Sequence, residues 1–211
     1  MSDERVAALL DRWMALTGPR GAKYGRELID CYREPHRHYH TDEHLAHIHD
    51  VLDLLETDAQ QPEAVRYAAW FHDAVYDIGI DSRLTNEERS ARLAEAVLRE
   101  MNAPKELVAE VGRLVRKTAD HRIEPSDRNG AVLCDADLAI LGSDPDDYLR
   151  YAAQIREEYR EIPGPQFRAG RAAILRDLLD RKAIYRTARA RYLYEAAARE
   201  NVAAEIARLT A

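Results

Sequence analysis

Residues 68–76 read AAWFHDAVY, an apolar stretch interrupted by the adjacent polar residues His72 and Asp73. Apolar residues recur here at the three- and four-residue spacing of a buried helix face, and Pro62 suits the first turn of such a helix. We therefore predict a helix from Pro62 that runs through Val75. A carboxylate in such a stretch is costly to bury unless it pairs with or binds a cation. The alternative is an exposed His-Asp pair on a solvated helix face.

The same helical spacing recurs on both sides of this stretch, separated by short Gly, Pro and Asn signals. Helices are expected at residues 3–16, 23–33, 41–55, 86–98, 104–115 and 144–159, with one or two more from Phe167 onward. Residues 81–85 and 122–129 are polar and are expected to be loops. Residues 132–141 are apolar except for two aspartates, which favours a buried helix over a short strand. The prediction is an all-α fold.

Length and composition agree with that class. The 211 residues are enough for one domain with a well-buried core, and we predict a single domain over residues 1–211. Ala, Leu, Glu and Arg dominate and only 9 Gly are present, which favours helix. The formal net charge of -7 argues against a nucleic-acid polymer as a partner, although a bound metal and a few arginines could hold a small phosphorylated ligand.

Two further expectations concern location and packing. No apolar run approaches the roughly 20 residues of a membrane span and no signal peptide is recognisable, so we expect a cytoplasmic protein without a membrane partner. Cys31 and Cys134 are expected as small buried side chains rather than as a disulfide. Apolar residues on the C-terminal helices would permit a homodimer if they are exposed. Tyrosines at positions 148, 151, 159, 185, 192 and 194 recur at roughly helical spacing and are expected to pack between helices.

Histidines and aspartates outside the opening stretch add to the chemistry. Six of the eight histidines lie between His36 and His49, and His44 follows a plausible N-cap, Thr41. Asp135 and Asp137 lie in the apolar segment 132–142, where one could cap or form a salt bridge while the other is free to bind a metal. Two imidazoles and two carboxylates would suit Mn, Fe, Co, Zn or Mg, with positions left for water and substrate.

The ordered set His44, His72-Asp73 and Asp137 resembles the signature of the HD superfamily of metal-dependent phosphohydrolases. The resemblance is greatest to a little-characterised branch of similar length and covers nearly the whole chain. The matching segments are residues 39–44, 69–77, 86–91, 135–142 and 155–159.

The resemblance implies a compact all-α bundle with additional C-terminal helices, in which His44, His72, Asp73 and Asp137 bind a divalent metal ion. It assigns the fourth ligand to Asp137 and leaves Asp135 as a structural or orienting carboxylate. The implied activity is hydrolysis of a phosphoester or pyrophosphate bond in a small phosphorylated metabolite, expected to be a nucleotide, through a metal-activated water.

Catalytic roles beside the metal follow from the same resemblance. His40 precedes His44 by one helical turn, as a proposed general acid does in the related cyclic-nucleotide phosphodiesterases, although His38 or His47 could lie equally near. His121 could also protonate the leaving oxygen, or bind substrate or a second metal. Asp77 could orient the attacking water; the alternative is a helix-end charge that faces solvent.

Substrate binding needs cationic donors, for which Arg is well suited. Lys117, Arg156 and Arg160 are the cations expected at the phosphate, Arg156 because its segment carries the resemblance. A solvated surface charge is the alternative for each. Asn86 and Glu87 are expected to face the pocket, although a helix N-terminus would explain both without function.

Two other functional hypotheses remain open. The chain could be a regulatory domain that binds a metal and a nucleotide without turnover, or a structural helical protein with a chance motif. A complete ligand set favours the enzyme, because a pure binding module has no need of open metal positions.

Overall fold

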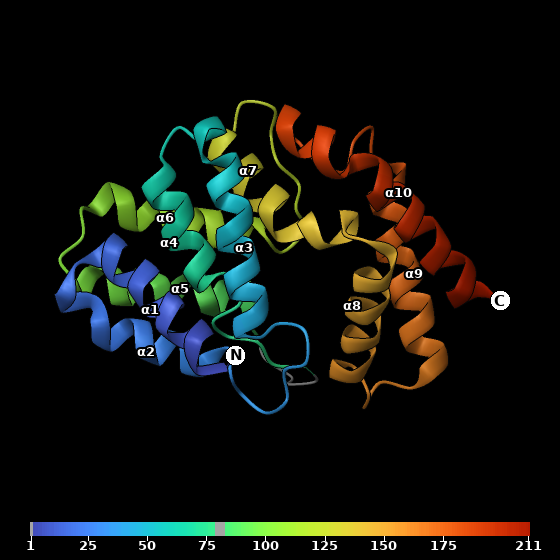
Figure 1. Ribbon diagram of the computed structural model, residues 1–211, viewed down its shortest axis with the longest axis horizontal. Coiled ribbons are helices and arrows are strands. Elements are labelled where there is room, and N and C mark those ends of the chain that lie inside the picture. The colour runs from blue at the N-terminus through green and yellow to red at the C-terminus, as the bar shows by residue number, and fades with distance from the viewer. Residues whose placement is uncertain (1, 79–82) are drawn as a thin grey trace.

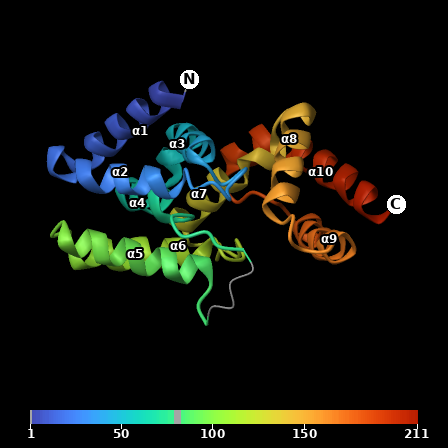
Figure 2. The same ribbon diagram turned by 90° about the horizontal axis from the view of Figure 1, so that it is seen from below.

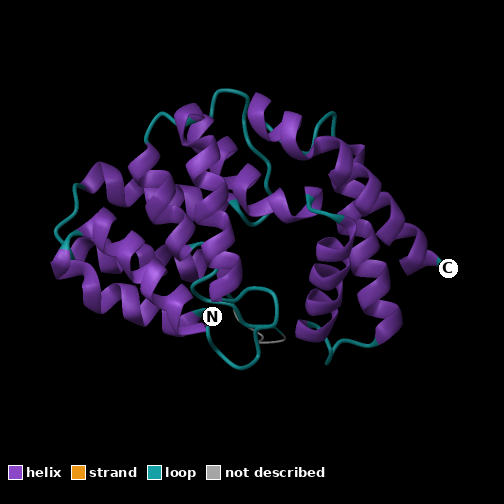
Figure 3. Cartoon of the chain, in the orientation of Figure 1, coloured by secondary structure: helices purple, strands orange, loops and turns teal. Residues whose placement is uncertain are grey.

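The computed structural model of the chain describes residues 2–78 and 83–211. Ten α-helices and three short 3-10 helices make up the regular structure of those residues, and Figure 3 shows no strand among them. The all-α prediction is confirmed for this part of the chain. Of the predicted loop at residues 81–85, residues 81 and 82 lie outside the described residues.

The first seven helices form a three-layered group, on the left in Figure 1. They are α1 Ser2–Thr17, α2 Ala22–Cys31, α3 Asp42–Leu55, α4 Pro62–Phe71, α5 Asn86–Glu100, α6 Lys105–Lys117 and α7 Arg128–Asp137. Figure 2 shows α1 and α2 on one side, the pair α5 and α6 on the other, and α3, α4 and α7 between them. The middle layer is therefore covered on both faces.

The last three helices form a second group, on the right in Figure 1. They are α8 Pro145–Glu158, α9 Gly164–Asp180 and α10 Ala188–Thr210. A 3-10 helix, η3 Leu138–Gly142, continues α7 into this group and contacts α8 and α10. One cluster of buried apolar side chains runs through both groups, from Trp13 of α1 to Val202 of α10.

The start of α3 is fixed by Thr41, as predicted. Its side-chain oxygen accepts a hydrogen bond from the Glu43 backbone N–H at 3.3 Å, which satisfies one of the unpaired N–H groups of the first turn. His44 is thereby the third residue of the helix. Its side chain is buried.

The end of α4 differs from the prediction: the helix stops at Phe71, short of Val75. Two N–H groups that would extend the helix bond elsewhere: that of Asp73 donates to the Tyr32 hydroxyl at 3.3 Å, and that of Val75 to the Ser90 hydroxyl at 3.0 Å. The fully buried guanidinium of Arg37 donates to the carbonyls of Asp73 at 2.7 Å and Ala74 at 3.1 Å, so the backbone of the turn finds its partners outside any helix. His72 and Asp73 lie in that turn rather than on a helix face.

The packing predictions are mostly confirmed. Both cysteines are free thiols, Cys134 buried and Cys31 half-buried. Five of the six tyrosines are buried or half-buried, but Tyr192 is 89% exposed, so the packing prediction is wrong there. Four of the large exposed apolar side chains, Leu149, Ile174, Tyr192 and Leu193, lie on α8, α9 and α10. Within the described residues, no helix is both long enough and apolar enough to cross a membrane.

We expect the protein to lose stability in acid because of His49. This residue of α3 is 1% exposed, and its ring centroid lies 5.0 Å from that of Trp70. Burial, together with the charges of Arg12 and Arg66, lowers the pKa of His49 from 6.5 to about 3. Below pH 6.5 His49 binds a proton in the unfolded chain but not in the folded chain. The free energy of unfolding therefore decreases as the pH falls. Between pH 6.5 and about pH 5 this residue alone should remove about 2 kcal/mol.

The measurement is the free energy of unfolding in urea at these two pH values for the wild type and His49→Leu. The variant should lose about 2 kcal/mol less than the wild type over the interval. Equal losses in the two proteins would contradict the assignment.

Candidate metal centre

Four side chains from three separate segments meet between the two groups of helices. His44 from α3, His72 and Asp73 from the turn after α4, and Asp137 from the end of α7 each offer one ligand atom, and these atoms lie within 4.8 Å of one another. His72 Nε2 is 3.0 Å from both His44 Nε2 and Asp73 Oδ2, and His44 Nε2 is 3.3 Å from Asp137 Oδ1. An ion with ligand bonds of about 2.1 Å holds adjacent ligands roughly 3 Å apart. The spacing therefore fits a single divalent ion.

The orientation of the His72 ring also fits a metal ligand. Its Nδ1 lies 2.9 Å from the Ala69 carbonyl oxygen, which can only accept, so Nδ1 carries a proton. In the neutral ring this leaves the Nε2 lone pair directed at the centre. A hydrogen bond from the distal ring nitrogen to a carbonyl is the arrangement that commonly fixes metal-binding histidines.

Charge at the centre has the sign that attracts a cation. Burial would raise the pKa of Asp73 and Asp137, but the His72 imidazole holds both below their ordinary range. Burial would likewise lower the pKa of His72, but the two carboxylates raise it well above its usual value. The carboxylates of Asp73 and Asp137 thus favour the positively charged form of the His72 imidazole between them. A divalent ion bound there would take the place of that positive charge.

Asp137 offers one oxygen to the centre and the other to His121. Oδ1 faces His44, whereas Oδ2 is 2.8 Å from His121 Nε2. His121 has a positive φ of 52°, a conformation that costs non-glycine residues roughly 1 kcal/mol or more. The backbone is held there because the His121 carbonyl accepts from Arg181 at 3.1 Å and its N–H donates to the Lys117 carbonyl at 3.2 Å.

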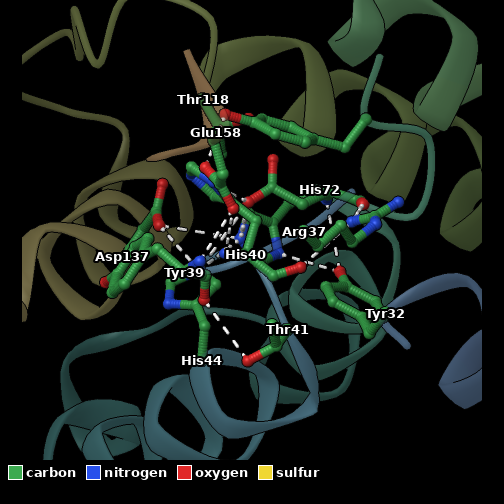
Figure 4. A network of polar contacts seen from close by, with 12 residues as sticks. Tyr32, Arg37, Tyr39, His40, Thr41, His44, His72, Thr118, Asp137 and Glu158 are labelled. Atoms are coloured by element: carbon green, nitrogen blue, oxygen red, sulfur yellow. Dashed lines mark hydrogen bonds and ion pairs between the residues drawn. The ribbon is translucent and has the colours of Figure 1, made fainter. Parts of the chain in front are cut away.

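Glu158 is the site residue that the sequence prediction missed. From the last turn of α8 its Oε1 accepts the backbone N–H groups of residues 38, 39 and 40 at 2.8, 2.8 and 2.9 Å. Its Oε2 lies 2.7 Å from His40 Nδ1 and accepts from the Tyr76 hydroxyl at 3.1 Å, as Figure 4 shows in part. A signal was present: Glu158 lies three residues after Ile155, on the apolar face of its helix.

Glu158 orients the imidazole of His40. With Nδ1 bound to that carboxylate, His40 Nε2 is directed toward the centre, 3.9 Å from Asp73 Oδ2. Burial opposes the charged form, but the carboxylates of Asp73 and Glu158 outweigh it and raise the pKa of His40. Of the alternatives considered from the sequence, neither His38 nor His47 lines the cavity beside the centre.

That cavity has a volume of about 590 Å³ and borders the candidate metal centre, because Asp73 and Asp137 line it. Polar side chains of the first group of helices line it, namely His40, Asp73, Glu87, His121 and Asp137. Apolar side chains of η3, α8 and α9 also line it, namely Leu138, Ile140, Leu141, Ile155, Leu175 and Leu178, and with them Ile174, which is 61% exposed. The cavity thus offers both polar and apolar contacts to a ligand.

All three arginines of the cavity wall are engaged by carboxylates. Arg171 donates to Glu205 at 2.9 Å and to the Tyr151 hydroxyl at 3.0 Å. Arg122 and Arg181 both pair with Asp177, at 2.6 and 2.8 Å. None of the three was among the cations expected from the sequence.

Arg156 and Arg160, expected at the phosphate, lie outside this cavity. The Arg156 guanidinium donates to the carbonyls of Tyr159 and Ile162 and lies 4.7 Å from the Phe167 ring centroid. It therefore holds the segment that follows the last residue of α8. Arg160 is largely exposed and pairs with Glu157.

Three more predicted residues lie outside the cavity, whereas Glu87 lines it. Asp77 pairs with Arg89 at 2.6 Å. The side-chain amide of Asn86 bonds the backbone N–H and carbonyl of Asp77 and so fixes the start of α5. Lys117 is half-buried in the last turn of α6.

Asp135 faces away from the four ligands. Its carboxylate accepts the backbone N–H groups of Arg186 at 2.8 Å and Thr187 at 2.7 Å. Burial raises its pKa to about 6, although these hydrogen bonds act in the opposite direction. The carboxylate thus ties α7 to the start of α10, while Asp137 points into the centre.

Comparisons of the chain with models of protein families, with curated proteins and with solved structures find no match. The interpretation of the centre therefore rests on its own residues and their geometry.

Proposed function

We propose that the protein is a divalent-metal-dependent phosphohydrolase of the HD type, acting on a small phosphorylated metabolite. The observation that carries the proposal is the convergence of His44, His72, Asp73 and Asp137, of which the two aspartates line a cavity. These residues come from segments far apart in the chain, and their order is the one that resembles the HD signature.

The donor set defines the metals to test. Two imidazole nitrogens and two carboxylate oxygens suit Mn, Fe, Co, Zn or Mg. An ion bound there would lower the pKa of a coordinated water and neutralise charge on the phosphoryl oxygens of a substrate. The hydrogen bonds from His72 to Ala69 and from His121 to Asp137 hold two of the ligands in place.

His40 is the residue to which we assign proton donation. Glu158 holds its Nδ1, and the carboxylates of Asp73 and Glu158 raise its pKa, which favours the protonated ring. A protonated imidazole whose Nε2 faces the cavity can donate to the oxygen of a leaving group. His121 has its Nε2 engaged by Asp137, so we assign it to positioning that ligand.

The mixed polar and apolar lining of the cavity supports a metabolite with one polar and one apolar part. Its volume of about 590 Å³ lies within the usual range for small-molecule sites, roughly 300–1,000 Å³. The phosphoryl group would lie at the centre, and the organic part against Ile155, Leu175 and Leu178. A nucleotide has this division and is the first class to test.

The experiment is a hydrolysis screen of nucleoside mono-, di- and triphosphates and of a nitrophenyl phosphodiester, with each of the five metals. For the substrate found, His40→Gln should lower kcat by about 10²–10⁴-fold. The variant should keep the wild-type metal content. The matched control is His47→Gln, an exposed histidine on the same helix as His44, which should keep full activity.

The screen also separates the alternatives. A metal-loaded protein that binds nucleotides but hydrolyses none would favour the regulatory domain. Full kcat in His40→Gln would remove His40 as the acid and leave the metal centre as assigned.

A further inference from the structure

A second large cavity lies at the other end of α7. It has a volume of about 710 Å³ and is formed by the loop before α7, the first turn of α7, the segment 182–187 and the first turns of α10. It shares no lining residue with the cavity at the metal centre. Nothing in the proposed hydrolysis uses it.

The charges in this cavity are unbalanced. Four cationic side chains of its wall, Arg128, Lys182, Arg186 and Arg191, make no hydrogen bond or ion pair with any described residue. Only two wall carboxylates, Asp58 and Glu124, are similarly unpaired, because the third, Glu195, is bound by Arg199 at 2.8 Å. An excess of two positive charges therefore faces one concave surface of a protein whose net charge is -7.

The two cavities differ in how their arginines are engaged. At the metal centre every wall arginine already binds a carboxylate, which leaves little charge for a ligand. In the second cavity the four cations have no such partner among the described residues, and free guanidinium groups that share one cavity wall are suited to bidentate binding of anionic oxygens. Concave walls also strengthen the local potential above that of a flat surface.

We propose that the second cavity is a binding site for a small polyanion, an organic or inorganic molecule with several phosphoryl or sulfonyl groups. Its volume suits a molecule of nucleotide size. A nucleic-acid polymer would extend beyond the cavity over a chain of net charge -7, which would repel it. The site is separate from the proposed active site and does not depend on the proposed activity.

The experiment measures binding of fluorescent pyrenetetrasulfonate to the full chain, loaded with its metal, by fluorescence anisotropy at low ionic strength. Sulfonates are weak ligands for divalent ions, so the metal centre should contribute little. The double variant Arg186→Ala, Arg191→Ala should raise Kd at least about tenfold, from the loss of two charge-assisted contacts. Pyrenemonosulfonate, with the same ring system and one charge, should bind at least about tenfold more weakly than the tetrasulfonate.

The matched control is the double variant Arg168→Ala, Arg208→Ala. These arginines are also exposed, their side chains make no hydrogen bond or ion pair with any residue in the described part of the chain, and they line another cavity, beside α8, α9 and α10. The control should keep the wild-type Kd, and the melting temperatures of both double variants should confirm that they are folded.

Three outcomes would overturn the proposal. They are no saturable binding of the tetrasulfonate by the wild type, an equal loss of affinity in the two double variants, and equal binding of the mono- and tetrasulfonates. A labelled single-stranded oligonucleotide that binds more tightly than the tetrasulfonate, and loses affinity in Arg186→Ala, Arg191→Ala, would replace the small polyanion with a polymer.

Discussion

Asp73→Ala is expected to lose its bound divalent ion and, with it, hydrolytic activity by about 10³-fold or more. Asp73 Oδ2 is 3.0 Å from His72 Nε2 and 3.7 Å from His44 Nε2, so its removal takes away one ligand and one of two negative charges. The measurement is metal content by elemental analysis of the purified wild type and variant. About one ion per chain is expected in the wild type, and none in a variant whose helical circular dichroism is unchanged.

The control for this experiment is Asp50→Ala. Asp50 lies exposed on α3 and pairs with Arg12, so its loss should leave the metal content unchanged. Equal metal in the wild type and Asp73→Ala would exclude Asp73 as a ligand. Absence of metal from the wild type, even after incubation with Mn and Fe, would refute the whole ligand set.

A second large effect is expected from Glu158→Ala, about 3–5 kcal/mol of lost stability. The carboxylate is fully buried and binds five donors: three backbone N–H groups, the His40 imidazole and the Tyr76 hydroxyl. Alanine would leave these donors buried without partners. The measurement is the free energy of unfolding in urea at pH 7, and the control is Glu157→Ala, whose side chain is 52% exposed.

The cost of this substitution should depend on pH. Burial would raise the pKa of Glu158, but His40 and the backbone N–H groups lower it from 4.5 to about 2. The stability that the ionised Glu158 carboxylate contributes is therefore present above pH 4.5 and is lost as the pH falls toward 2. The difference between wild type and variant should shrink between about pH 5 and pH 3, and an unchanged difference would argue against an ionic role.

The fold could be predicted from sequence where local signals decide it. Apolar periodicity located the helices. Thr41 marked the start of α3 because its side chain accepts a hydrogen bond from the backbone N–H of Glu43, two residues later. The end of α4 could not be predicted, because the next N–H groups bind Tyr32 and Ser90, which lie far away in the sequence. A pattern of neighbouring residues carries no information about such a partner.

The centre was predictable for a different reason. Asp73, Asp135 and Asp137 stand in apolar surroundings, where a charge requires a partner, and the resemblance then assigned the ligand to Asp137. The same reasoning applied to α8 would have found Glu158. Arg156 was placed at the phosphate from the resemblance of its segment, which does not say where a side chain points. Arg171 is missing from the prediction because an arginine on a helix is usually exposed, and its contacts with Glu205 and Tyr151 become visible only in the fold.

The link between α7 and α10 bears on how the protein is made. The N–H groups that bind Asp135 belong to residues 51 and 52 positions later in the chain. At roughly 5–20 residues per second, a ribosome adds them several seconds after α7. Until then the helix that carries Asp137 lacks this contact. Nascent chains stalled before Arg186 should therefore bind the proposed ion less tightly than the full chain does.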